Sequence, residues 1–297
     1  MWLGVCRCRV CSSRRTSWAG PSARPETGNG SARLSRRLCG CWSTPRRRRP
    51  TVSCEHPTER RTAKGPDVPA TKLIVFDVNE TLSDLEPMAH RFTDIGLPPQ
   101  LATTWFAQVL RDGFALAAAG SSGTFAAIGA GVLHSMFAKH APDRDADAAV
   151  QHVLGGFLSL DVHPDVPTGV HALAAGGLRL VTLSNGSTSV AEALLTKAGI
   201  RDQFERLLSV EDAGRWKPAP ESYAYAAGEC DVAPAEMLLV AVHPWDIDGA
   251  ARAGLQTAWI DRSGTAPYPS YLTTPDITAL GVDDLANKLA GGQPIDR

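Results

Sequence analysis

The chain has 297 residues and a formal net charge of −1, which leaves room for one large domain or two small ones. That small net charge hides two opposite parts. Residues 1–66 hold fourteen Arg and one Lys against three Glu, whereas the remainder holds 15 basic and 28 acidic residues. No run of about 18 apolar residues occurs, so no membrane span is expected.

Residues 1–66 form a basic leader with little apolar periodicity, and its arginine run "PRRRRP" cannot join a core. This composition favours a disordered extension, or a translated upstream region with the true start near Val68. Zinc binding, an organelle transit peptide and contact with nucleic acid remain alternatives. None has the expected ligand spacing, amphipathic face or interleaved aromatic residues. The leader contains six of the seven cysteines, Cys6, Cys8, Cys11, Cys39, Cys41 and Cys54.

The rest of the chain is acidic and has one cysteine, Cys230. A thiol-poor, acidic body is typical of a protein in the reducing cytoplasm, where disulfides are not expected. We therefore predict a cytoplasmic protein whose partners include neither a membrane nor nucleic acid.

Short apolar segments alternate with amphipathic ones after residue 70, and this order predicts a doubly wound α/β sheet like the Rossmann fold. The catalytic core is expected at residues 70–84 and 167–290. Strands that are apolar on both faces indicate a buried parallel sheet. The expected strands are residues 73–76, 178–183, 237–242 and 257–260. The expected helices are residues 170–175, 187–198, 221–229 and 247–253, the first, second and fourth of them followed by Gly.

Residues 85–166 do not fit this alternation. They are rich in Ala and helical in period, and they are far longer than a crossover connection requires. We predict an inserted helical cap, which would lie above the end of the sheet where open α/β folds bind ligands. An apolar cap helix could also serve a homodimer interface.

Polar side chains stand at or just beyond the predicted carboxyl ends of the strands. Taken singly, each is explained by a turn or a helix cap. Together they follow the order carboxylate, hydroxyl, amine, carboxylate, and they can converge on one crevice. These residues are Asp77, Thr81, Ser184, Asn185, Lys217 and Asp246.

Four sequence motifs, "FDVNETL", "LSNG", "KPAPESYAYA" and "HPWDIDGAARAG", resemble the successive motifs of the haloacid dehalogenase superfamily. The resemblance runs from about Lys72 to Leu289 and includes the cap insertion. It is strongest to the hydrolytic (S)-2-haloacid dehalogenases. Tyr223, six residues after Lys217, and the "WD" of the fourth motif fit that branch.

Two departures separate this chain from the phosphatases of the superfamily, which use a second aspartate as general acid and hold magnesium with fourth-motif acids. Asn79 occupies the general-acid position, and an amide cannot protonate a leaving alkoxide. Ala241 or Val242 occupies an acidic position of the fourth motif, and neither side chain binds a hard cation. The resemblance therefore implies a hydrolase that needs no cofactor and has no metal ligands. The alternative is a phosphatase with a degenerate magnesium site.

The resemblance also implies individual roles. Asp77 would attack carbon and displace halide, which leaves without a proton. Lys217 would keep Asp77 ionised, since a nearby cation lowers the pKa of a carboxyl group. Thr81 would orient the nucleophile, and Asp246 would position or deprotonate the water that hydrolyses the ester. The predicted reaction is conversion of a short 2-haloacid to a 2-hydroxy acid.

Substrate contacts are expected from both parts of the chain. Ser184 and the backbone amides near Asn185 would hold the carboxylate of a small anionic substrate. Haloacid dehalogenases usually carry an arginine after the cap tryptophan, whereas Phe106 follows Trp105 here and would either face the substrate or pack inside the cap. Arg111 lies about 240° further round the helix and should face elsewhere.

Three further residues are expected to line the pocket. His243 is a candidate donor or acid/base group, or a structural histidine. Trp245 would form a wall or fill the gap between sheet and cap, and Tyr223 would contact substrate. A member that binds a small anion without catalysis remains the alternative outside the enzymes.

Overall fold

A computed structural model describes residues 70–141 and 145–291. The predictions about the leader at residues 1–66 lie outside the described residues. Six parallel strands form one sheet in the order β3-β2-β1-β4-β5-β6, which confirms the predicted doubly wound α/β fold. The strands are β1 (Leu73–Phe76), β2 (Arg179–Ser184), β3 (Arg206–Ser209), β4 (Met237–Ala241), β5 (Gln256–Ile260) and β6 (Ile277–Ala279).

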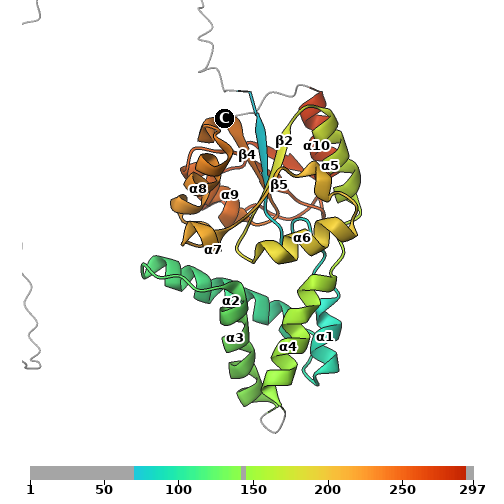
Figure 1. The fold of residues 1–297 in the computed structure, drawn as a ribbon, viewed down its shortest axis with the longest axis vertical. Helices are drawn as coiled ribbons and strands as arrows, with labels where there is room; N and C mark the ends of the chain where they lie inside the picture. The colour runs from blue at the N-terminus through green and yellow to red at the C-terminus, as the bar shows by residue number, and fades with distance from the viewer. Residues whose placement is uncertain (1–69, 142–144, 292–297) are drawn as a thin grey trace, which may run out of the picture. The chain divides into compact units, whose positions relative to one another are not determined.

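Helices cover both faces of this sheet (Figure 1). Ile74 and Phe76 of β1 belong to one apolar cluster and Leu73 and Val75 to another, because successive side chains of a strand point to opposite faces. The first face packs on α5 (Asp165–Ala175), α6 (Thr188–Lys197) and α10 (Val282–Ala290). The second packs on α8 (Pro220–Cys230) and α9 (Pro244–Arg252). Both faces of β1 are thus apolar, as the sequence predicts.

Two strands were not predicted from the sequence. Both β3 and β6 lie at the edges of the sheet, and each begins with a residue that is not buried. An edge strand needs less apolar surface than a central one, so these short segments lack the continuous apolar pattern of β1. The short elements near the edges are η2 (Arg201–Gln203), α7 (Val210–Ala213) and η3 (Pro234–Glu236).

Four helices and a short turn form the cap that follows β1, as predicted. They are α1 (Met88–Asp94), α2 (Leu101–Ala118), α3 (Phe125–His140), α4 (Ala146–Gly156) and η1 (Phe157–Ser159). The two chain segments that join cap and core run side by side: Ser83 bridges Val162, and the Asp84 amide donates to the Asp161 carbonyl at 2.8 Å. The boundaries at residues 85 and 166 stay a prediction.

Aromatic side chains form the interior of the cap and join it to the core. Trp105 lies 5.8–6.1 Å from the rings of Phe92, Phe125 and Phe157, and its indole N–H donates to the Gly129 carbonyl at 2.9 Å. The ring of Trp216, in the loop before α8, stacks on Phe125 with an interplanar angle of 9°. The cap is therefore packed against the loop that carries Lys217.

None of the helices within the described ranges is long and apolar enough to cross a membrane.

Candidate active site

Asp77 follows the last residue of β1, at the sheet edge where strand order reverses between β1 and β4. Open α/β sheets bind ligands at such a switch point. Thr81 donates its hydroxyl hydrogen to Asp77 Oδ2 at 2.8 Å and accepts the Val242 amide at 3.1 Å. The threonine therefore ties the loop after β1 to the end of β4 and fixes the orientation of the Asp77 carboxylate.

Lys217 lies between two carboxylates. Its Nζ is 2.9 Å from Asp77 Oδ1 and 2.6 Å from Asp246 Oδ2, and its side chain has no exposed surface. Tyr223 is also fully buried, and its hydroxyl donates to Asp246 Oδ1 at 2.6 Å. We call these four residues the Lys217 network. Both oxygens of Asp246 are occupied, and Tyr223 acts on the site through Asp246 rather than from the pocket wall.

The charges of this network set the protonation of Asp77. Burial alone would raise the pKa of Asp77, but the charges of Lys217 and His243 and their hydrogen bonds hold it well below its usual range. Burial alone would lower the pKa of Lys217, yet Asp246 and Asp77 raise it. Burial and the neighbouring Asp77 charge raise the pKa of Asp246. Asp77 is therefore ionised and oriented at neutral pH.

Ser184 is the last residue of β2, and Asn185, which follows it, contacts the loop that carries Lys217. The Ser184 hydroxyl accepts the Gly186 amide at 2.9 Å, which leaves its own hydrogen for an acceptor. Asn185 Oδ1 accepts the Lys217 amide at 3.0 Å, and its Nδ2 donates to the Lys217 carbonyl at 3.4 Å. The Asn185 side chain thus holds the backbone of Lys217 in place.

His243 follows β4 and contacts Asp77 directly. Its Nδ1 is 3.1 Å from Asp77 Oδ2, and its Nε2 is 2.8 Å from Glu80 Oε2. The ring of Trp245 stacks on the imidazole of His243, with 5.0 Å between the ring centroids. The ring of Phe114, in α2, packs against the ring of Trp245 at a centroid distance of 4.9 Å. Trp245 therefore fills the gap between core and cap beside His243.

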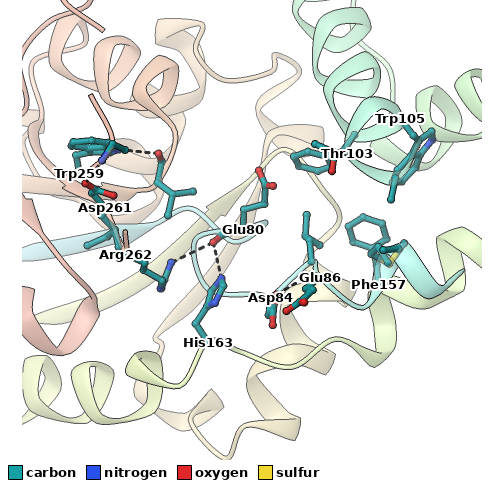
Figure 2. A pocket seen from close by; sticks show the side chains of 18 residues that line it. Glu80, Asp84, Glu86, Thr103, Trp105, Phe157, His163, Trp259, Asp261 and Arg262 are labelled. Carbon is teal, nitrogen blue, oxygen red and sulfur yellow. Dashed lines mark hydrogen bonds between the residues drawn. The ribbon is translucent and has the colours of Figure 1, made fainter. Parts of the chain in front are cut away.

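A pocket of about 520 Å³ lies between cap and core next to these residues. Figure 2 shows its side chains, among them Glu80, with the Glu80 carbonyl group accepting hydrogen bonds from His163 and Arg262. Phe106 and Val242 also line it. A smaller cavity of about 80 Å³ is bordered by Asn79 and Gly186. The loop after β1 thus borders two cavities, the larger at Glu80 and the smaller at Asn79.

Phe106 lies in the apolar cap cluster, 7% exposed and 6.2 Å from the ring of Phe125. Arg111 pairs with Asp112 at 2.8 Å and is 66% exposed. It lines a separate depression between α2 and α3. Arg111 therefore does not supply the cap arginine that Phe106 replaces, as its position on the helix predicts.

Glu80 was not among the residues that the sequence singled out. Two signals could have found it: it lies three residues after Asp77 within the loop of the first motif, and β1 and β4 are neighbours in the order expected for this fold. No group of three or more His, Cys, Asp or Glu side chains that could hold a metal ion occurs in the part of the chain that the structure describes.

Comparisons with known proteins agree with this geometry. A family model described as haloacid dehalogenase-like hydrolase matches residues 71–254. Haloacetate dehalogenase H-2 of Moraxella sp. (strain B) is 34% identical over 134 residues, 45% of this chain and 59% of that protein. (S)-2-haloacid dehalogenase of Pseudomonas sp. (strain YL) is 34% identical over 151 residues, 50% of this chain and 65% of that protein. The chain thus spans about three fifths of the length of these curated relatives.

Solved structures extend the likeness to the cap. L-2-haloacid dehalogenase from Xanthobacter autotrophicus superposes with a TM-score of 0.68 at 25% identity, covering 75% of this chain and 99% of that one. Because the family model covers the first motif, the cap and the whole of α9 in the fourth motif, the resemblance expected from the sequence is confirmed. The chain belongs to the haloacid dehalogenase-like hydrolase family.

Proposed function

We propose that the protein hydrolyses the carbon–halogen bond of a short 2-haloacid, using Asp77 as the nucleophile. One observation carries the proposal: the Asp77 carboxylate group is held by Lys217, Thr81 and His243 at the cap–core boundary. The names of the similar proteins, haloacetate and (S)-2-haloacid dehalogenases, support the same chemistry.

The reaction would have two stages. An Asp77 oxygen attacks the carbon that bears the halogen, the carbon–halogen bond breaks, and halide leaves with the bonding electrons. Water then adds to the carbonyl carbon of the resulting ester. The acyl–oxygen bond breaks, the 2-hydroxy acid leaves, and Asp77 is restored. Each turnover consumes one water and releases one halide and one proton.

The substrate carboxylate is best accommodated beside Ser184 and Gly186. The Ser184 hydroxyl keeps a hydrogen to donate, and backbone amides of this turn supply further dipoles. The cations of the site are already used, since Lys217 bridges Asp77 and Asp246 and His243 bridges Asp77 and Glu80. We therefore propose that hydroxyl and backbone groups, rather than an arginine, bind the acid.

The alternative of a magnesium-dependent phosphatase fits these residues poorly. The Lys217 ammonium group occupies the space between Asp77 and Asp246, where a cation shared by the two carboxylates would lie. The second oxygen of Asp246 accepts from Tyr223. Since Val242 adds no ligand, we propose a reaction that needs no metal, carried out in the cytoplasm on a small anion.

A paired assay separates the two enzymes. Halide release from 2-chloropropionate and 2-bromopropionate is measured beside phosphate release from a generic phosphate ester, each with and without magnesium. We expect halide release that magnesium does not change, and none from Asp77→Asn. Phosphate release that requires magnesium, or full activity of Asp77→Asn, would overturn the proposal.

A further inference from the structure

Asp77, His243 and Glu80 form a continuous line of hydrogen bonds, which we call the His243 relay. The distances are 3.1 Å from Asp77 Oδ2 to Nδ1 and 2.8 Å from Nε2 to Glu80 Oε2. Asp77 and Glu80 follow β1, and His243 follows the adjacent β4. A nucleophile, a histidine and a carboxylate in this order have the geometry in which a histidine acts as base and a carboxylate orients it.

The loop that carries Glu80 is held in an unusual conformation. Glu80 has a φ of +63°, in the left-handed region that side chains other than Gly and Asn rarely adopt. Its carbonyl accepts from His163 Nε2 at 3.0 Å, and Arg262, paired with Asp165, donates to the Thr81 carbonyl at 2.9 Å. Such strain persists where surrounding contacts fix it, often at functional sites. These contacts aim the Glu80 side chain at His243.

Asp246, which the sequence suggested as the base, is poorly placed for that task. Its two oxygens accept from Lys217 and Tyr223, each at 2.6 Å, and the residue has no exposed surface. A water could bind Asp246 only by displacing one of these donors. The His243 side chain is 12% exposed and faces the carboxyl group that becomes the ester.

We propose that His243 is the acid/base residue of the ester-hydrolysis stage and that Glu80 positions it and connects it to solvent. This inference rests on the proposed dehalogenation. Neutral His243 takes a proton from water through Nδ1 while the water oxygen bonds to the Asp77 carbonyl carbon. The imidazolium then returns that proton to the departing alkoxide oxygen as the acyl–oxygen bond breaks. Water is consumed, alcohol is released, and no further reactant is needed.

The charge of Asp77 would decide when His243 releases its proton and becomes a base. Burial alone would lower the pKa of His243, but hydrogen bonds and charges of Asp77 and Glu80 raise it to about 9, so the free enzyme holds an imidazolium ion. Lys217 faces the far oxygen of Asp77, and Trp245 stacks on the ring. Ester formation removes the Asp77 charge. The pKa of His243 then falls, and the ring can release a proton and become a base.

Glu80 offers the route for that proton. Its side chain is 41% exposed, whereas that of Asp77 is 5% exposed. Glu80 lines the 520 Å³ pocket together with Asp84, Glu86 and Asp261 (Figure 2), so the relay joins the buried Asp77 to a pocket whose wall includes further carboxylates. The proton produced in each turnover can leave through this carboxylate without crossing the Lys217 network.

Pre-steady-state kinetics of the full chain with excess substrate test the proposal. Wild type, His243→Gln and Glu80→Gln are mixed with 2-bromopropionate, halide is followed rapidly, and the Asp77 peptide is weighed by mass spectrometry. We expect His243→Gln to give a halide burst of one equivalent, then turnover slower by about 100- to 10,000-fold. The ester should accumulate on Asp77. In heavy-oxygen water, wild type should instead incorporate label into Asp77.

The Glu80→Gln variant tests whether Glu80 positions His243. We expect slower turnover with a normal burst, and a pH profile of ester hydrolysis that moves to lower pH, because a group that raises the pKa of His243 is lost. Glu229→Gln is the matched control: the same substitution on a side chain of similar exposure, 42%, whose partner is Arg206. It should leave turnover and pH profile unchanged.

Each contrary result has a separate meaning. If the halide burst of His243→Gln is slowed as much as its turnover and no ester accumulates on Asp77, then His243 only orients Asp77. That result would overturn the inference. Unchanged turnover would do the same. Absence of halide from wild type would instead overturn the proposed dehalogenation. Circular dichroism checks folding, and His243→Asn replaces His243→Gln if the latter does not fold.

Discussion

The core side and the cap side of this active site use different side chains. The core contributes ionised groups, each held by a partner: Lys217 between Asp77 and Asp246, and His243 between Asp77 and Glu80. Helices α1 and α2 contribute to the pocket wall, among the described residues, only uncharged side chains. These are Met88, Ala89, Ala102, Thr103, Trp105 and Phe106.

This difference suits the core to bond breaking and the cap to the choice of substrate. The charges of the core set the protonation of Asp77 and are not free to recognise a substrate. The cap can discriminate by shape and apolar contact, because α1 and α2 contribute no cation to the described part of the pocket wall. Changes on the core side should therefore affect stability and turnover, and changes on the cap side should affect the apparent affinity for the acid.

The largest effect is expected from Lys217→Met. The substitution leaves Asp77 and Asp246 buried with no shared cation, and breaking a buried pair costs about 3–5 kcal/mol. Urea denaturation should show a lower free energy of unfolding, and halide release should be lost. On the cap, Arg111→Met breaks only an exposed pair with Asp112 and serves as the control. Equal stability of the two variants would contradict the comparison.

A pH-dependent loss of stability is expected next. The pKa of His243 is raised from 6.5 to about 9 in the folded protein by Asp77 and Glu80, against the effect of burial. The contribution of His243 to the stability of the folded protein is therefore complete below pH 6.5 and disappears as the pH rises toward 9. Thermal midpoints of wild type should fall across this window, and those of His243→Gln should fall less. Parallel curves for both proteins would argue against a charged His243.

Tyr223→Phe should have a smaller effect. It removes the hydroxyl that donates to Asp246 Oδ1 at 2.6 Å and leaves a buried acceptor unpaired. Such a loss costs about 1–3 kcal/mol. Denaturant midpoints measure the stability, and the Michaelis constant for 2-bromopropionate should stay near that of wild type, since Tyr223 lies beneath Asp246. A large rise in that constant would restore Tyr223 as a substrate contact.

The sequence predicted the central features of both regions because strong local patterns mark them. Apolar segments identified β1, β2, β4 and β5, and the polar groups that end them proved to converge. The edge strands β3 and β6 were not predicted from the sequence, because their partial exposure weakens the apolar pattern. The contact between Glu80 and His243 was not predicted either. It depends on the positive φ of Glu80 and on the direction of its side chain, which spacing along the sequence does not reveal.

The smallest effect, and the one that sharpens the role of the cap, is expected from Phe106→Arg. An arginine here would offer a charge-assisted hydrogen bond, which contributes about 1.5–3 kcal/mol. Part of that gain is offset because Phe106 is 7% exposed and packs near Phe125. We expect about a tenfold lower Michaelis constant for 2-chloropropionate, equivalent to about 1.4 kcal/mol.

Its control is 2-chloropropionamide, which lacks the negative charge and should show no gain with the same variant. A second control, Phe106→Leu, keeps the site apolar and should improve neither substrate. Equal gains for acid and amide would mean that Phe106 limits access by size. No gain for either would mean that an arginine at position 106 does not reach the acid group held beside Ser184 and Gly186.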